Sequence, residues 1–217
     1  MLVAMRVNTH ALWACFVLFA CALPNADAAE RDLSGLDSLV AAEMKAGGTP
    51  GAAISIVLGD SVVYARGFGV ASVEGGEPVT PETLFRVAST TKMLVAAALC
   101  AQAEEGMVDF AAPISRYARA LDPAIGRISV HQLLSHTAGL ADESSFDGPH
   151  DEEALGAFVR SWRADRLFTE PGDVYSYSNP GYALAGHVLA SAADTIFDAA
   201  MAAHLFRPLG KIGRAHV

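Results

Sequence analysis

The sequence predicts an α+β fold in which an antiparallel sheet is flanked by helices and is joined by a helical subdomain. Residues 52–58 and 62–68 are rich in β-forming side chains and are linked by Gly59-Asp60, a pair typical of a hairpin turn. The rest of the chain consists mainly of apolar segments of helical length and period. Because two strands alone make a marginal sheet, either the domain is mostly helical or further strands belong after Gly210. The foreign tail described below favours the second, so we expect that this chain lacks those strands.

The hairpin is expected to lie between two helices. The first helix ends at the glycine pair 47–48, and it is indicated by four apolar residues near helical spacing: Leu33, Leu36, Val40 and Met44. Residues 74–81, after the hairpin, are a Gly/Pro-rich loop. Residues 84–87 are then expected to form a short strand that leads into the second helix.

The second helix is expected to begin near Ser89 and to end at Gly106. Its segment from Met93 to Ala101 is apolar on every side, which is typical of a helix enclosed by a core. Cys100 lies midway along this segment, and we expect its side chain to be a small apolar filler rather than a reactive group.

Four later segments are expected to be helical, and they end at Pro208-Leu209-Gly210. Between the first and second of them, residues 141–151 are expected to form an acidic loop. The segments are residues 128–134, 151–162, 181–193 and 196–206.

Residues 1–28 have the features of an export signal. Arg6 supplies positive charge, residues 11–23 are apolar, and Ala26-Asp27-Ala28 matches a small-x-small cleavage site. Cleavage after Ala28 would release a periplasmic or secreted protein. The alternative is a lipoprotein signal ending at Cys21, which would attach the protein to a membrane through lipid.

The end of the chain is expected to be foreign. Residues 212–217, Ile-Gly-Arg-Ala-His-Val, back-translate as a widely used sequencing adapter, so we expect residues 211–217 to be a non-native tail. The domain would then comprise residues 29–210, as the N-terminal part of a larger natural one.

Composition excludes several classes of function. The net charge of −9 and the absence of a basic cluster argue against nucleic acid as a partner. A hydrophobic content of 52% indicates a folded core rather than disorder.

His131 and His136 are five residues apart, which is the wrong spacing for one helix face, and no H-E-x-x-H motif is present. No metal or organic cofactor is therefore implied.

Ser89-Thr90-Thr91-Lys92 sets a hydroxyl and an amine one helical turn apart. Residues three apart on a helix are neighbours, so Ser89 Oγ and Lys92 Nζ could touch at the start of the buried helix. An amine removed from water accepts a proton more readily, which would make Ser89 a nucleophile. The alternative is an ordinary helix start, with Ser89 as its cap and Lys92 in solvent.

Three motifs together resemble the penicillin-recognising serine hydrolases. They are Ser89-Thr90-Thr91-Lys92, residues 133–140 (Leu-Leu-Ser-His-Thr-Ala-Gly-Leu) and residues 177–182 (Tyr-Ser-Asn-Pro-Gly-Tyr). The likeness is to the branch of class C β-lactamases, D-alanyl-D-alanine carboxypeptidases and S-x-x-K esterases. It implies a β-lactamase/transpeptidase-like fold and a β-lactam, D-amino-acid peptide or small ester as substrate.

The resemblance also implies a role for each residue of the motifs. Ser89 would attack a carbonyl carbon and form an acyl-enzyme, assisted by Lys92. Tyr177 would carry the proton and later assist the water that removes the acyl group. The resemblance leaves open whether Lys92 or Tyr177 is the base. Asn179 would bind the substrate amide and hold Lys92, and the Ser89 N–H would form half of an oxyanion hole. In such proteins the segment around His136 is a structural turn.

The family's third motif, Lys-Thr-Gly or His-x-Gly, is absent. Lys211-Ile212-Gly213 imitates it only by its letters, because isoleucine lacks a hydroxyl and the tail is expected to be foreign. We therefore expect this chain to fold poorly and to be nearly inactive, whereas its parent would be an enzyme. The alternatives are a catalytically silent binding or scaffold protein of this family and a helical binding module whose motifs are coincidental.

Overall fold

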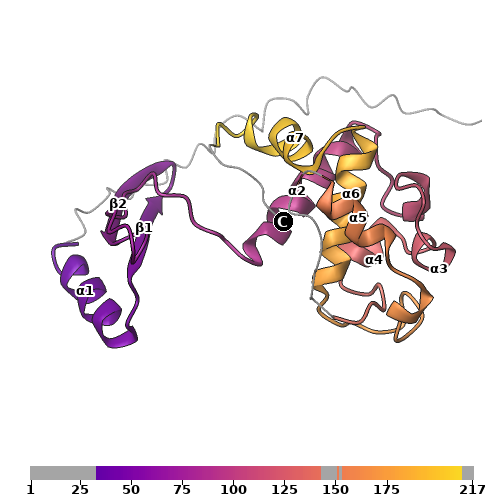
Figure 1. Cartoon of the computed structure of the whole chain (residues 1–217). Helices are drawn as coiled ribbons and strands as arrows, with labels where there is room; N and C mark the ends of the chain where they lie inside the picture. Colours follow the sequence, from indigo (N-terminus) through magenta and orange to yellow (C-terminus); the bar gives the residue numbers. More distant parts are fainter. Residues whose placement is uncertain (1–32, 143–150, 152, 212–217) are drawn as a thin grey trace, which may run out of the picture. The chain divides into compact units, whose positions relative to one another are not determined.

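The computed structural model describes residues 33–142, 151 and 153–211. The chain divides at Leu84 and Phe85 into two compact units, each with its own packing. The first unit holds one helix and the sheet, and the second unit is helical (Figure 1).

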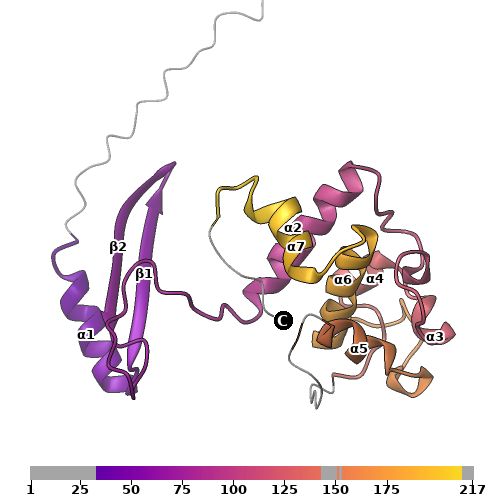
Figure 2. The ribbon, with the colours of Figure 1, turned by 45° about the horizontal axis from the view of Figure 1, so that its top comes forward.

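The first unit consists of a helix packed beside a hairpin, as both ribbon views show (Figures 1 and 2). Helix α1 (Leu36–Gly47) ends at Gly48, whose φ of 62° is the left-handed conformation that glycine adopts without strain. Strands β1 (Gly51–Leu58) and β2 (Ser61–Gly69) are antiparallel, with Leu58 paired to Ser61 across a two-residue turn. Asp37 of α1 accepts hydrogen bonds from Tyr64 and Arg66 of β2, which joins the helix to the sheet.

The second unit is built around helix α6 (Asn179–Ala192), nine of whose residues are buried. This helix contacts α2 (Thr90–Glu104), α4 (Val130–Leu134), α5 (Ala154–Arg160) and α7 (Phe197–Met201). A π-helical turn (Ala202–Phe206) continues α7, and α3 (Pro123–Gly126) and two 3₁₀ turns (Ile114–Arg116 and Ala164–Arg166) complete the unit.

The core of the second unit is aliphatic and closely enclosed. Leu99 of α2, Leu133 of α4 and Leu184 of α6 are inaccessible to solvent. Burial of each such side chain contributes about 1.5–3 kcal/mol. Gln102 of α2 is also fully buried, and its amide donates a 2.9 Å hydrogen bond to the Leu189 carbonyl of α6. The core therefore fixes α2 and α6 against each other.

Most expected elements are found near their expected bounds, but the strand over residues 84–87 is wrong. That segment has no regular structure, and Leu84, Phe85 and Val87 are exposed. A strand needs a neighbour for its backbone hydrogen bonds. Across residues 33–142, 151 and 153–211 the only strands are β1 and β2, which pair with each other.

Helix α2 is only partly buried, which corrects a second expectation. Met93 is 64% exposed, and Ala97 and Cys100 lie on the same exposed stripe at helical spacing. Cys100 is a free, exposed thiol rather than an apolar filler. A helix that is apolar on every side still has one stripe of residues that faces away from the helices it packs on. The sequence alone does not indicate which residues form that stripe.

Several expectations lie outside the described residues. These are the export signal with its alternative at Cys21, most of the acidic loop (143–150), the adapter-like residues 212–217 and the strands expected after Gly210. Where residues are described, no single helix has the length and apolarity needed to cross a membrane, although α6 and the segment 197–206, bent by 78°, pass that test as a pair.

Candidate active site

The residue before the expected nucleophile has an unusual backbone conformation. Ala88 has φ of 45°, a left-handed conformation that costs a residue other than glycine about 1–3 kcal/mol. Ser89 is the N-terminal cap residue of α2, but its side chain makes no capping hydrogen bond. The hydroxyl of Ser89 is thus not used as a helix cap, which removes the ordinary reading of the S-x-x-K motif as a helix start.

Ser89, Lys92 and Tyr177 meet at the N-terminus of α2. Ser89 Oγ and the Tyr177 hydroxyl are 2.6 Å apart and share a hydrogen bond. Lys92 Nζ donates to Ser89 Oγ over 3.3 Å and lies 4.8 Å from the centre of the Tyr177 ring. The nucleophile expected from the sequence therefore has both a cation and a phenol within reach.

Asn179 joins the same cluster through Lys92. Its Oδ1 accepts a 2.7 Å hydrogen bond from Lys92 Nζ. All four residues expected from the sequence, Ser89, Lys92, Tyr177 and Asn179, are thus brought together within the second unit.

Asp142 is a further member that sequence reasoning missed. Its carboxylate accepts hydrogen bonds from the Asn179 backbone N–H over 3.1 Å and from Asn179 Nδ2 over 3.3 Å. With Nδ2 directed to Asp142, Oδ1 of Asn179 faces Lys92. The sequence offered little signal, because Asp142 belongs to a segment whose acidic composition is typical of a solvated loop.

The start of α6 positions Tyr177 and Asn179. Ser178 is 2% exposed and caps the helix by accepting a 2.9 Å hydrogen bond from the Gly181 N–H. Pro180 lies in the first turn, where its missing N–H costs nothing. The buried cap therefore directs Tyr177 and Asn179, one residue either side of it, to the cluster.

The electrostatic environment of the site favours proton transfer by Tyr177. Hydrogen bonding by Lys92 and then by Ser89, together with the Lys92 charge, lowers the pKa of the Tyr177 phenol below its usual value of 10.0. Burial raises the pKa of the neighbouring Tyr182 phenol instead. Of these two phenols, Tyr177 is the one prepared to accept a proton from Ser89.

The backbone N–H of Ser89 is available to a ligand. Within the described residues it donates no hydrogen bond, whereas the Thr90, Thr91 and Lys92 N–H groups each bond the carbonyl three residues back. A free N–H at a helix start can stabilise negative charge that develops on a substrate oxygen.

His136 lies beside the cluster, next to Tyr177. Its ring packs against Tyr177 with the ring centres 4.6 Å apart. His131 is exposed on α4 and is not part of the cluster. Among the described residues no group of three His, Cys, Asp or Glu side chains is arranged to hold a metal ion.

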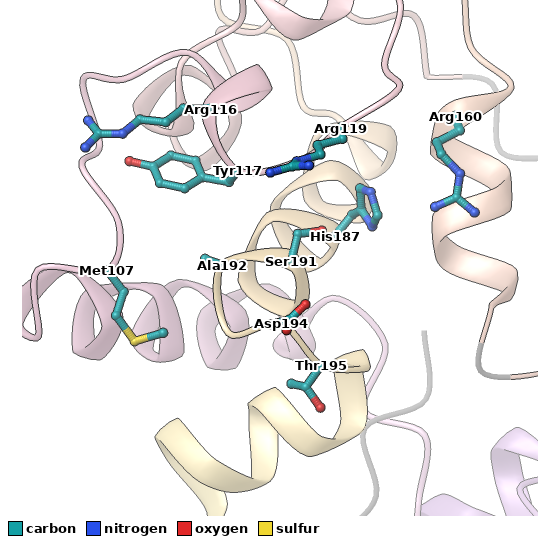
Figure 3. Close-up of a pocket in the computed structure, with 10 residues that line it drawn as sticks. All are labelled: Met107, Arg116, Tyr117, Arg119, Arg160, His187, Ser191, Ala192, Asp194 and Thr195. Carbon is teal, nitrogen blue, oxygen red and sulfur yellow. The ribbon is translucent and has the colours of Figure 1, made fainter.

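A hollow of about 680 Å³ lies elsewhere in the unit, and none of the cluster residues lines it (Figure 3). Arg116, Arg119 and Arg160 line it, but the Arg116 guanidinium is directed away from His187 in the view of Figure 3, so the three cations do not converge. His187 is 9% exposed, and burial followed by the charge of Arg160 lowers its pKa from 6.5 to about 4.

Known proteins match most of the chain. A family model described as Beta-lactamase covers residues 36–215. Protein flp of Staphylococcus aureus strain MW2 is 26% identical over 180 residues, which are 80% of this chain and 36% of the relative. A β-lactamase of Providencia stuartii is 30% identical over 200 residues, which are 90% of this chain and 50% of the relative.

Solved structures agree with these matches. The octameric penicillin-binding protein homologue from Pyrococcus abyssi superposes with a TM-score of 0.70 at 28% identity, over 82% of this chain and 43% of that chain. The fold class expected from the sequence and the resemblance stated there are both confirmed. This chain spans half or less of the length of these three proteins.

Proposed function

The chain belongs to the Beta-lactamase family, and we propose that the complete protein is a serine hydrolase that forms an acyl-enzyme on Ser89. The observation that carries the proposal is the 2.6 Å hydrogen bond between Ser89 Oγ and the Tyr177 hydroxyl, with Lys92 Nζ 3.3 Å from the same oxygen. A hydroxyl paired with a group that can take its proton is the arrangement of an activated nucleophile.

In the acylation step Ser89 Oγ attacks the substrate carbonyl carbon while its proton passes to the oxygen of Tyr177. The lowered pKa of Tyr177 increases the fraction of phenolate that can act as base. The Ser89 N–H stabilises the resulting oxyanion. When the tetrahedral intermediate collapses, the bond to the leaving group breaks and Tyr177 returns the proton to that group.

In the deacylation step a water molecule attacks the acyl ester. Tyr177 takes the proton of the water and then gives it to Ser89 Oγ, which restores the free enzyme. Lys92 remains a cation that favours the phenolate form of Tyr177. The amide of Asn179, held by Asp142 and Lys92, orients the substrate next to Ser89.

The substrate class we propose is a β-lactam or a D-amino-acid peptide, with small esters as the third candidate. Two matched proteins, a β-lactamase and a penicillin-binding protein homologue, support the β-lactam candidate through their descriptions. The D-amino-acid peptide and ester candidates rest on the resemblance carried by the three sequence motifs.

The test labels the complete protein with a fluorescent penicillin and, separately, with a fluorophosphonate. We expect covalent label on Ser89, lost in Ser89→Ala and retained in the control Ser161→Ala, which changes an exposed serine that directly follows helix α5. Label from the fluorophosphonate alone would favour an esterase. No label from either probe would contradict the proposal and favour a silent binding or scaffold protein.

We further propose that residues 1–217 by themselves hydrolyse these substrates only slowly. Loss of a single oxyanion donor costs about 10²–10³ in rate, and the third motif that supplies one is absent from the sequence. Fast ester hydrolysis by the 217-residue chain, together with a cooperative thermal transition, would contradict this.

Export is proposed on the basis of residues 1–28. Mass spectrometry of the protein recovered from a bacterial host should give a mature chain that begins at Ala29. A chain that begins with a lipid-modified Cys21, and that leaves the membrane when Cys21 is replaced, would favour the lipoprotein alternative.

A further inference from the structure

One residue holds the backbone on both sides of Tyr177. The Ser176 N–H donates a 2.8 Å hydrogen bond to the carbonyl oxygen of His136. The Ser178 N–H donates a 3.0 Å hydrogen bond to Nδ1 of the same histidine. The two residues that flank Tyr177 are therefore both hydrogen-bonded to His136, which lies about forty residues earlier in the chain.

The imidazole ring of His136 also contacts the Tyr177 ring. The two ring centres are 4.6 Å apart with an angle of 30° between the planes. Tyr177 is 42% exposed, so few other groups restrict its ring. Tyr177 also bonds the hydroxyl of Ser89 through its own hydroxyl, and its ring faces the ammonium of Lys92.

We propose that His136 is a positioning residue that holds the phenol of Tyr177 against Ser89, and that it does so only while its imidazole is neutral. The proposal rests on the serine hydrolase function described above. His136 does not itself touch the reacting atoms. It acts through Tyr177, whose phenol oxygen must stay within hydrogen-bonding distance of Ser89 Oγ.

The requirement for a neutral ring follows from the hydrogen bond at Nδ1. A ring nitrogen accepts from the Ser178 N–H only if it carries no proton, so the tautomer of His136 is the one protonated at Nε2. Protonation at Nδ1 would bring two donors face to face and break the bond. The backbone on the C-terminal side of Tyr177 would then be released.

The surroundings of His136 favour its neutral form. Burial and then the charge of Lys92 on α2 lower the pKa of His136 below 6.5, while the charge of Asp142 opposes them. The other titratable groups that face the ring are the phenols of Tyr175, Tyr177 and Tyr182. The hydrogen bond between the Ser178 N–H and His136 Nδ1 is therefore expected to be lost only on the acid side of neutrality.

Two substitutions at His136 distinguish the role of its hydrogen-bond acceptor from the role of its aromatic ring. His136 has φ of 59°, and asparagine tolerates this left-handed conformation better than most residues. In His136→Asn the side-chain oxygen can still accept from the Ser178 N–H and does not titrate. In His136→Phe the ring remains but the acceptor is lost.

The rate of acylation by a fluorescent penicillin, measured against pH in the complete protein, tests the proposal. We expect His136→Phe to lose about 10²-fold in rate, the usual cost of a misplaced reacting group. We expect His136→Asn to keep most of the acylation rate near neutral pH. We also expect it to lose the part of the rate decrease at low pH that protonation of His136 causes in the unmodified protein. His131→Asn, the same change at an exposed histidine on α4, should leave rate and profile unchanged.

Two results would overturn the proposal: a folded His136→Phe variant that acylates as fast as the unmodified protein, or a His136→Asn variant whose rate falls at low pH as steeply as that of the unmodified protein. Circular dichroism and thermal melting of each variant identify a rate loss caused by unfolding.

Side-chain ¹⁵N shifts of histidine provide a test that does not depend on activity. The His136 signals, assigned by their loss in His136→Asn, should show Nδ1 without a proton and Nε2 with one. A proton on Nδ1 at neutral pH would overturn the proposal even in a protein that fails to label at Ser89. Failure of the proposed serine hydrolase function is thus distinguishable from failure of the proposed positioning role of His136.

Discussion

The hydroxyl groups of Ser89 and Tyr177 are 2.6 Å apart although 88 residues separate them in the sequence. This contact is made by the N-termini of two helices, α2 and α6, which pack against each other in one core. The proposed chemistry depends on this packing, because neither helix alone carries both groups.

Removal of the Tyr177 hydroxyl should slow acylation. In Tyr177→Phe the ring can still pack on His136, but the proton acceptor for Ser89 is lost. We expect a fall of about 10²–10⁴-fold in the acylation rate, the usual contribution of general acid–base catalysis. Rapid-mixing kinetics with a chromogenic cephalosporin measure it. Tyr175→Phe is the matched control, because Tyr175 is 70% exposed, and an equal loss there would count against the assignment.

Removal of the Lys92 charge should shift the pH dependence of the reaction. Lys92 is the leading cause of the lowered pKa of Tyr177, so in Lys92→Met the phenol pKa should rise. Less phenolate is then present at a given pH, and the rate profile should move to higher pH as well as falling. Tyrosinate absorbance, with Tyr177→Phe subtracted, follows the phenol directly. Lys45→Met on α1 should leave both measurements unchanged.

Replacement of Asp142 by alanine should weaken both the site and the start of α6. The variant loses two hydrogen bonds to Asn179, the first residue of the helix. A carboxylate near a helix N-terminus contributes about 0.3–1 kcal/mol, and urea unfolding should show a loss of that size. Because Asn179 is proposed to bind substrate, we also expect KM to rise. A variant with unchanged KM and unchanged stability would show that Asp142 has no part in holding Asn179.

Protonation of His187 should destabilise the second unit in acid. Its folded-state pKa of about 4 lies below the unfolded value of 6.5, so the unfolded chain binds the extra proton first. Stability is therefore fully present above about pH 6.5 and decreases as the pH falls toward 4, by up to about 3 kcal/mol. Urea unfolding across this range measures the slope.

The control for His187 is a second histidine variant. His187→Gln should flatten the dependence of stability on pH, whereas His131→Gln at an exposed position should not. A slope that is unchanged in His187→Gln would assign the acid sensitivity to other groups.

Features that depend on neighbouring residues were predictable from the sequence. The turn at Gly59-Asp60 predicted the hairpin, because the chemistry of a tight turn depends on a few adjacent residues. The spacing of Ser89 and Lys92 predicted their contact, because residues three apart on a helix are neighbours. Tyr177 and Asn179 were singled out by a resemblance carried on short motifs, and both lie beside the N-terminus of α2.

The distant residues that support the cluster became evident from the packing of the folded chain. Asp142 and His136 were judged from sequence as loop and turn, yet they hold Asn179 and the backbone around Tyr177 over 37 and 42 residues respectively. The exposed stripe of α2 and the missing strand at residues 84–87 were also decided by packing. Short-range periodicity specifies which elements form, whereas the faces they bury and the side chains they bring together depend on contacts between elements distant in the chain.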